Sequence, residues 1–262
     1  MSTSERSVAG AHGRAPLRGE LVVVAHGAGN DLARAARAAA LGADIIEADV
    51  HGYRGRIEVR HLKTLGRLPV LWDRWWLAPG WRARLTLREL CEEAARAPGP
   101  ALMFDLKADL GTGDVVAEEL ETLRSRRRVL VCSQTWHLLE PFHGMPDVTV
   151  LHSIGNAQQL AMFEERAPLD GCDGVSIHAR LLSERVIGRL RAHASFITTW
   201  PINDERRLAH VARLGVDGVT TDSERIIRTV AAARGAAIGD AGGLRDTASG
   251  VADAHGGRRR RR

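Results

Sequence analysis

The sequence predicts an α/β protein that folds as a small closed barrel of eight parallel strands, a TIM (β/α)8 barrel. From residue 21 to residue 233, short runs of Val, Ile and Leu alternate with longer segments of helical period. Strands that alternate with helices in this way are typical of a parallel sheet. Eight such units in a folded part of about 217 residues fit a barrel at the small end of its size range. A doubly wound sheet is the alternative.

Each predicted strand is a run of five to eight residues rich in aliphatic side chains, a length typical of buried strands. In chain order the runs are LVVVA (21–25), ADIIEADV (43–50), ALMFDLK (101–107), RVLVC (128–132), VTVLH (148–152), DGVSIH (173–178), SFITTW (195–200) and DGVTTD (217–222).

The predicted helices follow the strands in turn. The first runs from Asp31 to Leu41, and the second is displaced to about 86–96, where Thr86 and Glu89 form a capping-box start. The longer connection before that second helix contains a short strand-like piece, RIEVR. The remaining helices are expected near 114–126, 135–143, 156–166, 183–193, 204–214 and 223–233.

Composition places the chain among ordinary globular proteins. Of its 262 residues 44% are hydrophobic and 26% charged, which excludes disordered, collagenous and membrane-spanning classes. The formal charge of +5 equals the five arginines of Arg258 to Arg262, so the body of the protein is neutral. We therefore expect no specific nucleic-acid partner, and only a weak contact of the tail with anionic surfaces. Composition does not indicate the oligomeric state.

We expect one domain, residues 19–235, between two disordered tails, 1–18 and 236–262, because both ends lack a hydrophobic period. No apolar run approaches the roughly 20 residues of a membrane helix, and the N-terminus has no secretory signal. The three cysteines, Cys91, Cys132 and Cys172, form no CxxC motif, and no histidine stands beside them at zinc spacing. They are interpreted as reduced structural thiols, which favours a cytoplasmic location.

Charged residues follow two of the predicted strands at a spacing of two. Glu47 and Asp49 form one pair and Asp105 and Lys107 the other, so each pair lies on one face of its strand. A barrel gathers the carboxyl ends of its strands at one mouth, where the chemistry of this fold takes place. Unpaired charges there would be costly, so a cation is expected among them. An ion-pair network at the mouth is the alternative.

Glu47, Asp49 and Asp105 offer the oxygen ligands that a hard divalent cation such as Mg²⁺ or Ca²⁺ prefers. Three carboxylates, one divalent ion and Lys107 sum to zero charge, and such a neutral site can accept an anionic phosphodiester. Lys107 is also one of only two lysines among 37 basic residues, and a compact ammonium differs chemically from a planar guanidinium. The sequence thus predicts a metal site with a phosphate-binding lysine.

Two histidines are expected at the same mouth. His26 follows the first strand and His61 follows RIEVR, and a pair of imidazoles suits acid and base catalysis near neutral pH. We interpret His61 as the base and His26 as the acid. Trp200, at the end of the seventh strand, either forms a wall of the substrate pocket or packs beneath a loop.

These landmarks resemble, in order, those of the glycerophosphodiester phosphodiesterase family. The resemblance covers about residues 21 to 230, essentially the whole folded part. It implies a TIM barrel, a divalent metal on Glu47, Asp49 and Asp105, catalytic histidines at His26 and His61, and cleavage of a small phosphodiester to an alcohol and glycerol phosphate. The matching segments are His26, Gly-Ala-Asp at 42–44, Glu47-Ala-Asp49-Val50, His61, Asp105-Leu-Lys107, Trp200-Pro-Ile-Asn203 and Gly215-Val-Asp-Gly-Val-Thr-Thr-Asp222.

The sequence also departs from the family pattern. The arginine that usually follows the first histidine is missing, Leu62 replaces an aspartate after His61, and Asp105 stands where glutamate is commoner. The short first loop and the Phe-Asp-Leu-Lys strand resemble the sphingomyelinase D and phospholipase D branch of the superfamily. Two further hypotheses are therefore kept: a lipid phosphodiesterase that transfers to an internal hydroxyl, and a non-catalytic binder of phosphorylated ligands.

Overall fold

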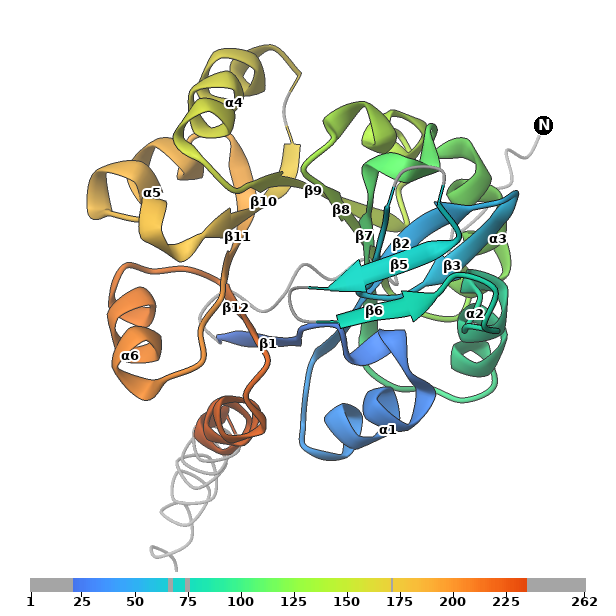
Figure 1. Cartoon of the computed structure of the whole chain (residues 1–262). Coiled ribbons are helices and arrows are strands. Elements are labelled where there is room, and N and C mark those ends of the chain that lie inside the picture. The colour runs from blue at the N-terminus through green and yellow to red at the C-terminus, as the bar shows by residue number, and fades with distance from the viewer. Residues whose placement is uncertain (1–20, 66–67, 74–75, 171, 235–262) are drawn as a thin grey trace, which may run out of the picture.

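Eight parallel strands close into a barrel in a computed structural model that describes residues 21–65, 68–73, 76–170 and 172–234 (Figure 1). Around the barrel the strand order is β1-β12-β11-β10-β9-β8-β7-β2, and pairing of β1 with β2 closes the ring. The predicted TIM barrel is therefore confirmed. The barrel strands are β1 (Val22–Ala25), β2 (Ile45–Tyr53), β7 (Ala101–Leu106), β8 (Val129–Ser133), β9 (Val148–Ile154), β10 (Cys172–His178), β11 (Ala194–Trp200) and β12 (Gly218–Thr221).

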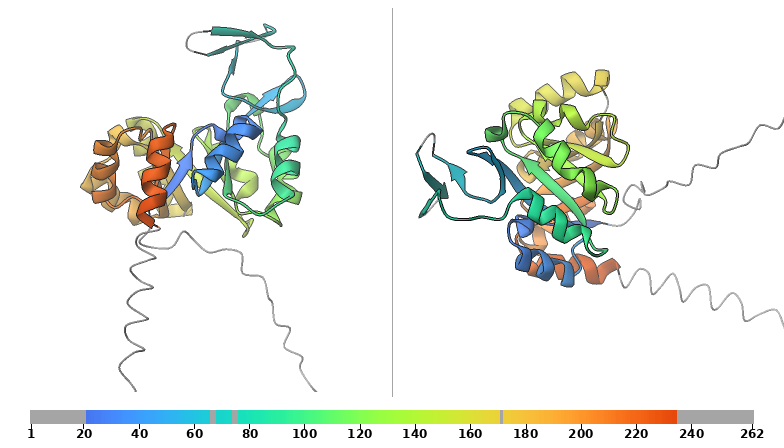
Figure 2. Two further views of the ribbon diagram at one scale, coloured as in Figure 1. Left: turned by 90° about the horizontal axis from the view of Figure 1, so that it is seen from below. Right: turned by 90° about the vertical axis from the view of Figure 1, so that its right-hand side faces the viewer.

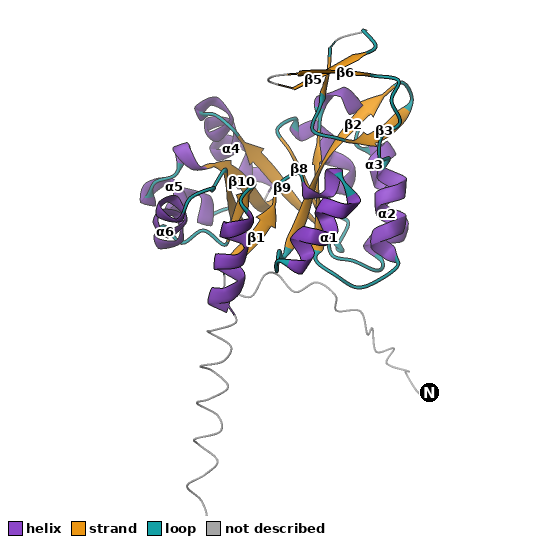
Figure 3. Cartoon of the chain, turned by 60° about the horizontal axis from the view of Figure 1, so that its bottom comes forward, coloured by secondary structure: helices purple, strands orange, loops and turns teal. Residues whose placement is uncertain are grey.

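Helices cover the outside of the barrel (Figure 3). Most of the named helices begin at a side-chain cap. Thr86 and Glu89 form the predicted capping box of the second helix, while Asp31, Ser183 and Asp204 cap three others. A further helical run, 224–234, reaches the end of the described residues. The named helices are α1 (Leu32–Ala40), α2 (Leu87–Ala95), α3 (Asp114–Arg124), α4 (Ala157–Asp170), α5 (Glu184–Arg191) and α6 (Glu205–Arg213).

One predicted helix has a different form. The segment expected to be helical at 135–143 is a 3₁₀ helix, Trp136–Phe142, that contains Pro141. Proline has no N–H to donate and its ring clashes with the preceding turn, so a regular α-helix is disfavoured there. Leu138, Leu139 and Phe142 are nevertheless buried, so the segment covers the barrel as the expected helix would.

The inside of the barrel changes from apolar to polar along the strands. Residues of six strands, among them Ile45, Met103 and Leu151, pack into an apolar layer. Because side chains two residues apart share a face, the next inward positions are polar: Glu47 follows Ile45 and Asp105 follows Met103. The apolar layer fills the barrel interior, and the polar residues lie beyond it towards the carboxyl ends of the strands.

The long segment between β2 and α2, residues 54–86, lies outside the barrel, and we call it the excursion. Strand β2 continues past the barrel and pairs with the antiparallel strand β3 (Arg56–Val59), which confirms the strand-like piece expected there. The sequence does not predict the three-stranded antiparallel sheet that follows, β4 (Lys63–Thr64), β5 (Val70–Asp73) and β6 (Trp76–Pro79). Figure 2 shows this excursion projecting away from the barrel. A small separate core of Tyr53, Leu62, Leu71 and Ala78 holds it together.

All three cysteines are free, in agreement with their interpretation as thiols. In the part of the chain that the structure describes, no helix has the length and apolar character needed to cross a membrane. The tails expected to be disordered, 1–18 and 236–262, lie outside the described residues.

Candidate active site

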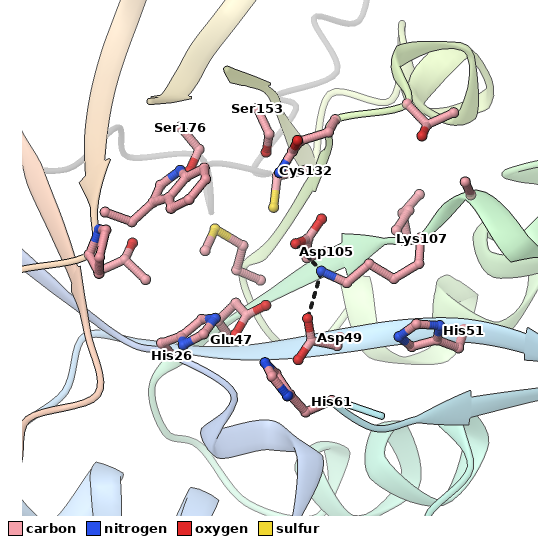
Figure 4. A pocket seen from close by; sticks show the side chains of 18 of the residues that line it. His26, Glu47, Asp49, His51, His61, Asp105, Lys107, Cys132, Ser153 and Ser176 are labelled. Carbon is pink, nitrogen blue, oxygen red and sulfur yellow. Dashed lines mark hydrogen bonds and ion pairs between the residues drawn. The ribbon is translucent and has the colours of Figure 1, made fainter. Parts of the chain in front are cut away.

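A cavity of about 450 Å³ opens at the carboxyl ends of the barrel strands (Figure 4). Its volume suits a small-molecule ligand. Every residue that the sequence singled out for a site lines this one cavity, although those residues come from widely separated parts of the chain. They are His26, Glu47, Asp49, His61, Asp105, Lys107 and Trp200.

Three carboxylates lie side by side at the base of this cavity. Glu47 and Asp49 belong to β2, and the register between β2 and β7 places Asp105 directly beside Asp49. One oxygen from each of the three groups lies within 4.8 Å of the others. Glu47 is only 2% exposed, and its burial, together with the charge of Asp49, raises its pKa to about 8. Convergent oxygen ligands of this kind, two of them buried and one half-buried, fit a hard divalent cation.

Lys107 points into the carboxylate cluster. Its Nζ lies 2.6 Å from Asp49 Oδ1 and also donates to Asp105 Oδ2 (Figure 4). Burial opposes the charge of the ammonium, but the neighbouring carboxylates raise the pKa of Lys107 well above its ordinary value. When Glu47 is ionised, as it would be with a cation bound, one ammonium compensates only one of the three negative charges. The ion-pair network considered from the sequence is thus present in part, and it leaves charge for a cation to neutralise.

The loop after β1 positions two of the carboxylates. Gly27, in a left-handed conformation with φ of 56°, donates its backbone N–H to Glu47 Oε2. Asn30 binds Asp49 twice: its Nδ2 donates to Asp49 Oδ2 at 2.8 Å, and its Oδ1 accepts from Asp49 N at 2.8 Å. Sequence reasoning noted the missing arginine in this loop and overlooked Asn30. The only available signal was an amide residue in the loop that follows the first strand.

His26 and His61 are neighbours in the cavity, with the edge of one ring towards the face of the other. Their ring centroids are 6.2 Å apart and the rings are perpendicular. His26 Nδ1 lies 2.7 Å from Asp222 Oδ1, and this hydrogen bond outweighs burial and raises the pKa of His26 to about 9. Asn203 in turn donates to Asp222 at 3.2 Å. His61 Nδ1 has a longer contact, 3.3 Å, with Asp73 Oδ2.

The cavity is also lined by a third histidine, His51, which the sequence analysis did not single out. His51 follows Asp49 by two residues and therefore lies on the same face of β2. Its Nδ1 lies 2.8 Å from Asp109 Oδ2, and burial lowers the pKa of His51. The spacing of two that identified Glu47 and Asp49 would also have identified His51, had it been continued along the strand.

Trp200 forms part of the cavity wall, which is one of the two roles considered for it. Its ring also packs against His178, with the centroids 4.8 Å apart and the planes at 69°. Small residues, Ser153, Ser176 and Thr220, line the same cavity from β9, β10 and β12. They leave room above the apolar layer of the barrel.

No family model matches this chain, and no curated protein matches it significantly in sequence. In its fold the chain is similar to many solved parallel barrels, including the tryptophan synthase α subunit of Campylobacter jejuni at a TM-score of 0.51 and 11% identity. That neighbour illustrates that a barrel alone does not define a chemistry.

Several structural neighbours are glycerophosphodiester phosphodiesterases. The enzyme of Parabacteroides distasonis matches with a TM-score of 0.64 and 18% identity over 82% of this chain and 98% of that one. The Thermotoga maritima enzyme matches with a TM-score of 0.60 and 20% identity over 80% and 98%. A phosphodiesterase of Oleispira antarctica, solved with the product sn-glycerol-3-phosphate, matches at 0.60 and 20% over 80% and 96%. The resemblance seen in the sequence is therefore confirmed at the level of the fold.

The contact between His26 and Asp222 generates a pH prediction. In metal-free protein, Asp222→Asn should lower the pKa of His26 from about 9 to near or below its ordinary 6.5, because burial of the ring is then opposed by weaker interactions. An NMR titration of the imidazole measures this directly. The interactions that raise the pKa of His26 also stabilise the wild-type fold. Their contribution to the free energy of unfolding is complete below pH 6.5 and is lost as the pH rises through about 9. Glu224→Gln, a nearby exposed carboxylate, is the control; an unchanged His26 titration in Asp222→Asn would refute the assignment.

Proposed function

We propose that the protein is a metal-dependent phosphodiesterase that cleaves glycerophosphodiesters to an alcohol and glycerol phosphate. The observation that carries this proposal is the perpendicular pair His26 and His61 at the mouth of the cavity that also contains the carboxylate cluster. Proton donors and acceptors next to a cation-binding cluster are what phosphodiester cleavage requires. The structural neighbours support the same class of reaction, and the neighbour solved with sn-glycerol-3-phosphate supports a small phosphorylated ligand.

In this proposal Glu47, Asp49 and Asp105 hold one divalent cation, Mg²⁺ or Ca²⁺. Their oxygen ligands, their burial and the charge left over by Lys107 fit such an ion. A bound cation of this kind stabilises the negative charge that grows on phosphoryl oxygens during the reaction. Lys107 places a second positive charge beside the same position, where it can bind a phosphate oxygen.

The two histidines take different roles in the proposal. His26, protonated at neutral pH because its pKa is about 9, donates a proton to the oxygen of the leaving alcohol. Asp222 orients the ring through Nδ1, which leaves Nε2 for that transfer. His61 accepts the proton of the attacking hydroxyl, with Asp73 against its Nδ1. Trp200 closes one side of the cavity against solvent. The three free thiols support a reducing location, and the cytoplasm stays our prediction.

The attacking group is proposed to be a hydroxyl of the substrate itself. A glycerophosphodiester has a hydroxyl on the carbon next to the esterified one, so a short tether holds that hydroxyl near phosphorus. Such tethering saves the entropy that a free water loses on being positioned. The loop after β1 also lacks the arginine usual in this family, which leaves fewer groups to orient a water. The first product is then a cyclic phosphate that is opened or released.

Replacing either histidine tests the proposed reaction. With glycerophosphocholine as substrate, His26→Ala and His61→Ala should each lower turnover by about 10²- to 10⁴-fold, the usual loss when a positioned proton donor or acceptor is removed. His210→Ala, an exposed histidine on α6, is the matched control and should retain activity. Adding a chelator should stop the wild-type reaction. Wild-type protein that binds the ligand with no turnover at any metal concentration would instead support the non-catalytic binder.

Removing the neighbouring hydroxyl of the substrate tests whether that hydroxyl is the attacking group. An analogue in which hydrogen replaces the neighbouring hydroxyl should bind and remain uncleaved, while phosphorus NMR of the parent reaction should reveal a cyclic phosphate. Persistence of that species would favour the transferase type of phospholipase D, and its opening would favour hydrolysis. Cleavage of the analogue at a rate close to that of the parent would exclude the internal attack.

A further inference from the structure

The sheet of the excursion has two faces of different character. Side chains alternate between the faces of a strand, and Leu71 and Ala78 lie on the inner face, buried against Tyr53 and Leu62. Trp72 lies on the outer face and pairs across the strands with Leu77. These two residues are 36% and 66% exposed. An antiparallel sheet with one solvated face normally presents polar side chains there, so this outer face is atypical.

Other apolar side chains are exposed in the segments directly next to these strands in the chain. Trp81 is 72% exposed just after the sheet, and Leu65 and Leu68 are 42% and 57% exposed between β4 and β5. Five of the eight large apolar side chains that are exposed in the described part of the chain belong to this one excursion. A concentration of this kind marks an interaction surface. We call it the docking face, defined by Leu65, Leu68, Trp72, Leu77 and Trp81.

The docking face lies in the most basic segment of the body. Residues 54–84 contain seven arginines and one lysine against one aspartate and one glutamate, a formal excess of +6. Since the body without the terminal arginines is neutral, the rest of it has an excess of −6. Lys63 lies over the Trp72 ring, with its Nζ 5.7 Å from the centroid, and Arg82 is exposed next to Trp81. The tail is therefore not the only basic segment, which the overall charge count concealed.

We propose that the docking face binds the surface of an anionic lipid bilayer. Tryptophan and leucine that enter the interface, with lysine and arginine at the level of the head groups, are the combination that binds such surfaces. A second copy of the chain fits less well, because it would bring two segments of +6 together. A bilayer with negative charge complements both the apolar and the basic residues.

The position of the docking face connects it to the candidate active site. The excursion projects beyond the ends of the barrel strands (Figures 2 and 3), and its residues His61 and Lys63 line the cavity. A bilayer bound there lies next to the cavity mouth, so phosphodiesters of membrane-resident glycerolipids reach it without first crossing bulk water. This second step rests on the proposed function, whereas binding to the bilayer does not.

Vesicle flotation tests the binding step. The full chain should float with vesicles of phosphatidylcholine mixed with phosphatidylglycerol, and more weakly with phosphatidylcholine alone. The double variant Leu77→Ser, Trp81→Ser should bind the mixed vesicles at least about tenfold more weakly, because interfacial binding scales with the apolar area inserted. Arg82→Glu should weaken binding to the mixed vesicles and leave the weak binding to phosphatidylcholine unchanged. Val115→Ser, Met162→Ser, which removes exposed apolar residues from α3 and α4, is the matched control and should bind as wild type does.

Two further experiments distinguish bilayer binding by the docking face from binding by the arginine tail and from a role of the docking face as a dimer interface. Deleting Arg258 to Arg262 removes the contribution of the tail, and the double variant should still lose binding in the shortened chain. Equal flotation of wild type and double variant, or binding lost only with the tail, would overturn the proposal. A concentration-dependent dimer in analytical ultracentrifugation that the double variant abolishes would also overturn it, in favour of a second copy of the chain.

Measurements of turnover distinguish a failure of the bilayer-binding proposal from a failure of the proposed function. The double variant should cleave soluble glycerophosphocholine at the wild-type rate, which also shows that it is folded, and should cleave a lysophospholipid in mixed vesicles about tenfold more slowly. If the wild type cleaves neither substrate yet floats as expected, the proposed function fails and the docking face stands. If both substrates are cleaved at wild-type rates by the double variant, the docking face fails and the phosphodiesterase stands.

Discussion

Mutual repulsion among three clustered carboxylates, two of them buried and one half-buried, is the constraint on which the rest of the site depends. Glu47, Asp49 and Asp105 lie within 4.8 Å of one another, in a barrel whose neighbouring layer is apolar. Burial of Glu47 and, second to it, the negative charge of Asp49 raise the pKa of Glu47 to about 8. Lys107, 2.6 Å from Asp49, compensates a part of this charge. In our proposal the remaining charge is neutralised by a divalent cation, which in turn allows the site to accept an anionic phosphodiester.

A single strand organises most of these groups. Strand β2 presents Glu47, Asp49 and His51 on one face, and its extension past the barrel carries the excursion with His61 and the docking face. A parallel register with β7 then sets Asp105 beside Asp49. The geometry of one strand therefore links the carboxylates, one of the two neighbouring histidines and the surface that we propose binds a bilayer. The second histidine, His26, directly follows the adjacent strand β1, and its ring lies next to that of His61.

Patterns with a short period along the chain were sufficient to predict the eight barrel strands, the capping box at Thr86, and the carboxylates and lysine spaced by two. Contacts between distant segments were not predictable in the same way. His26 and Asp222 are separated by 196 positions, and only the closed barrel brings them within 2.7 Å. Asn30 binds Asp49 through a loop conformation that no periodicity encodes. The antiparallel sheet of the excursion depends on a small core of four residues, too short a pattern to indicate three strands.

Calorimetric titration of the protein with Mg²⁺ and with Ca²⁺ tests the central claim most directly, because it asks whether the carboxylate cluster holds an ion without requiring turnover. The wild type should bind one ion per chain. Glu47→Gln, which keeps the shape of the side chain and removes one negative ligand, should lose measurable binding while its thermal unfolding remains cooperative. Glu165→Gln, an exposed position on α4, should bind as the wild type does. Unchanged metal affinity in Glu47→Gln, or no binding of either ion by the wild type, would contradict the account.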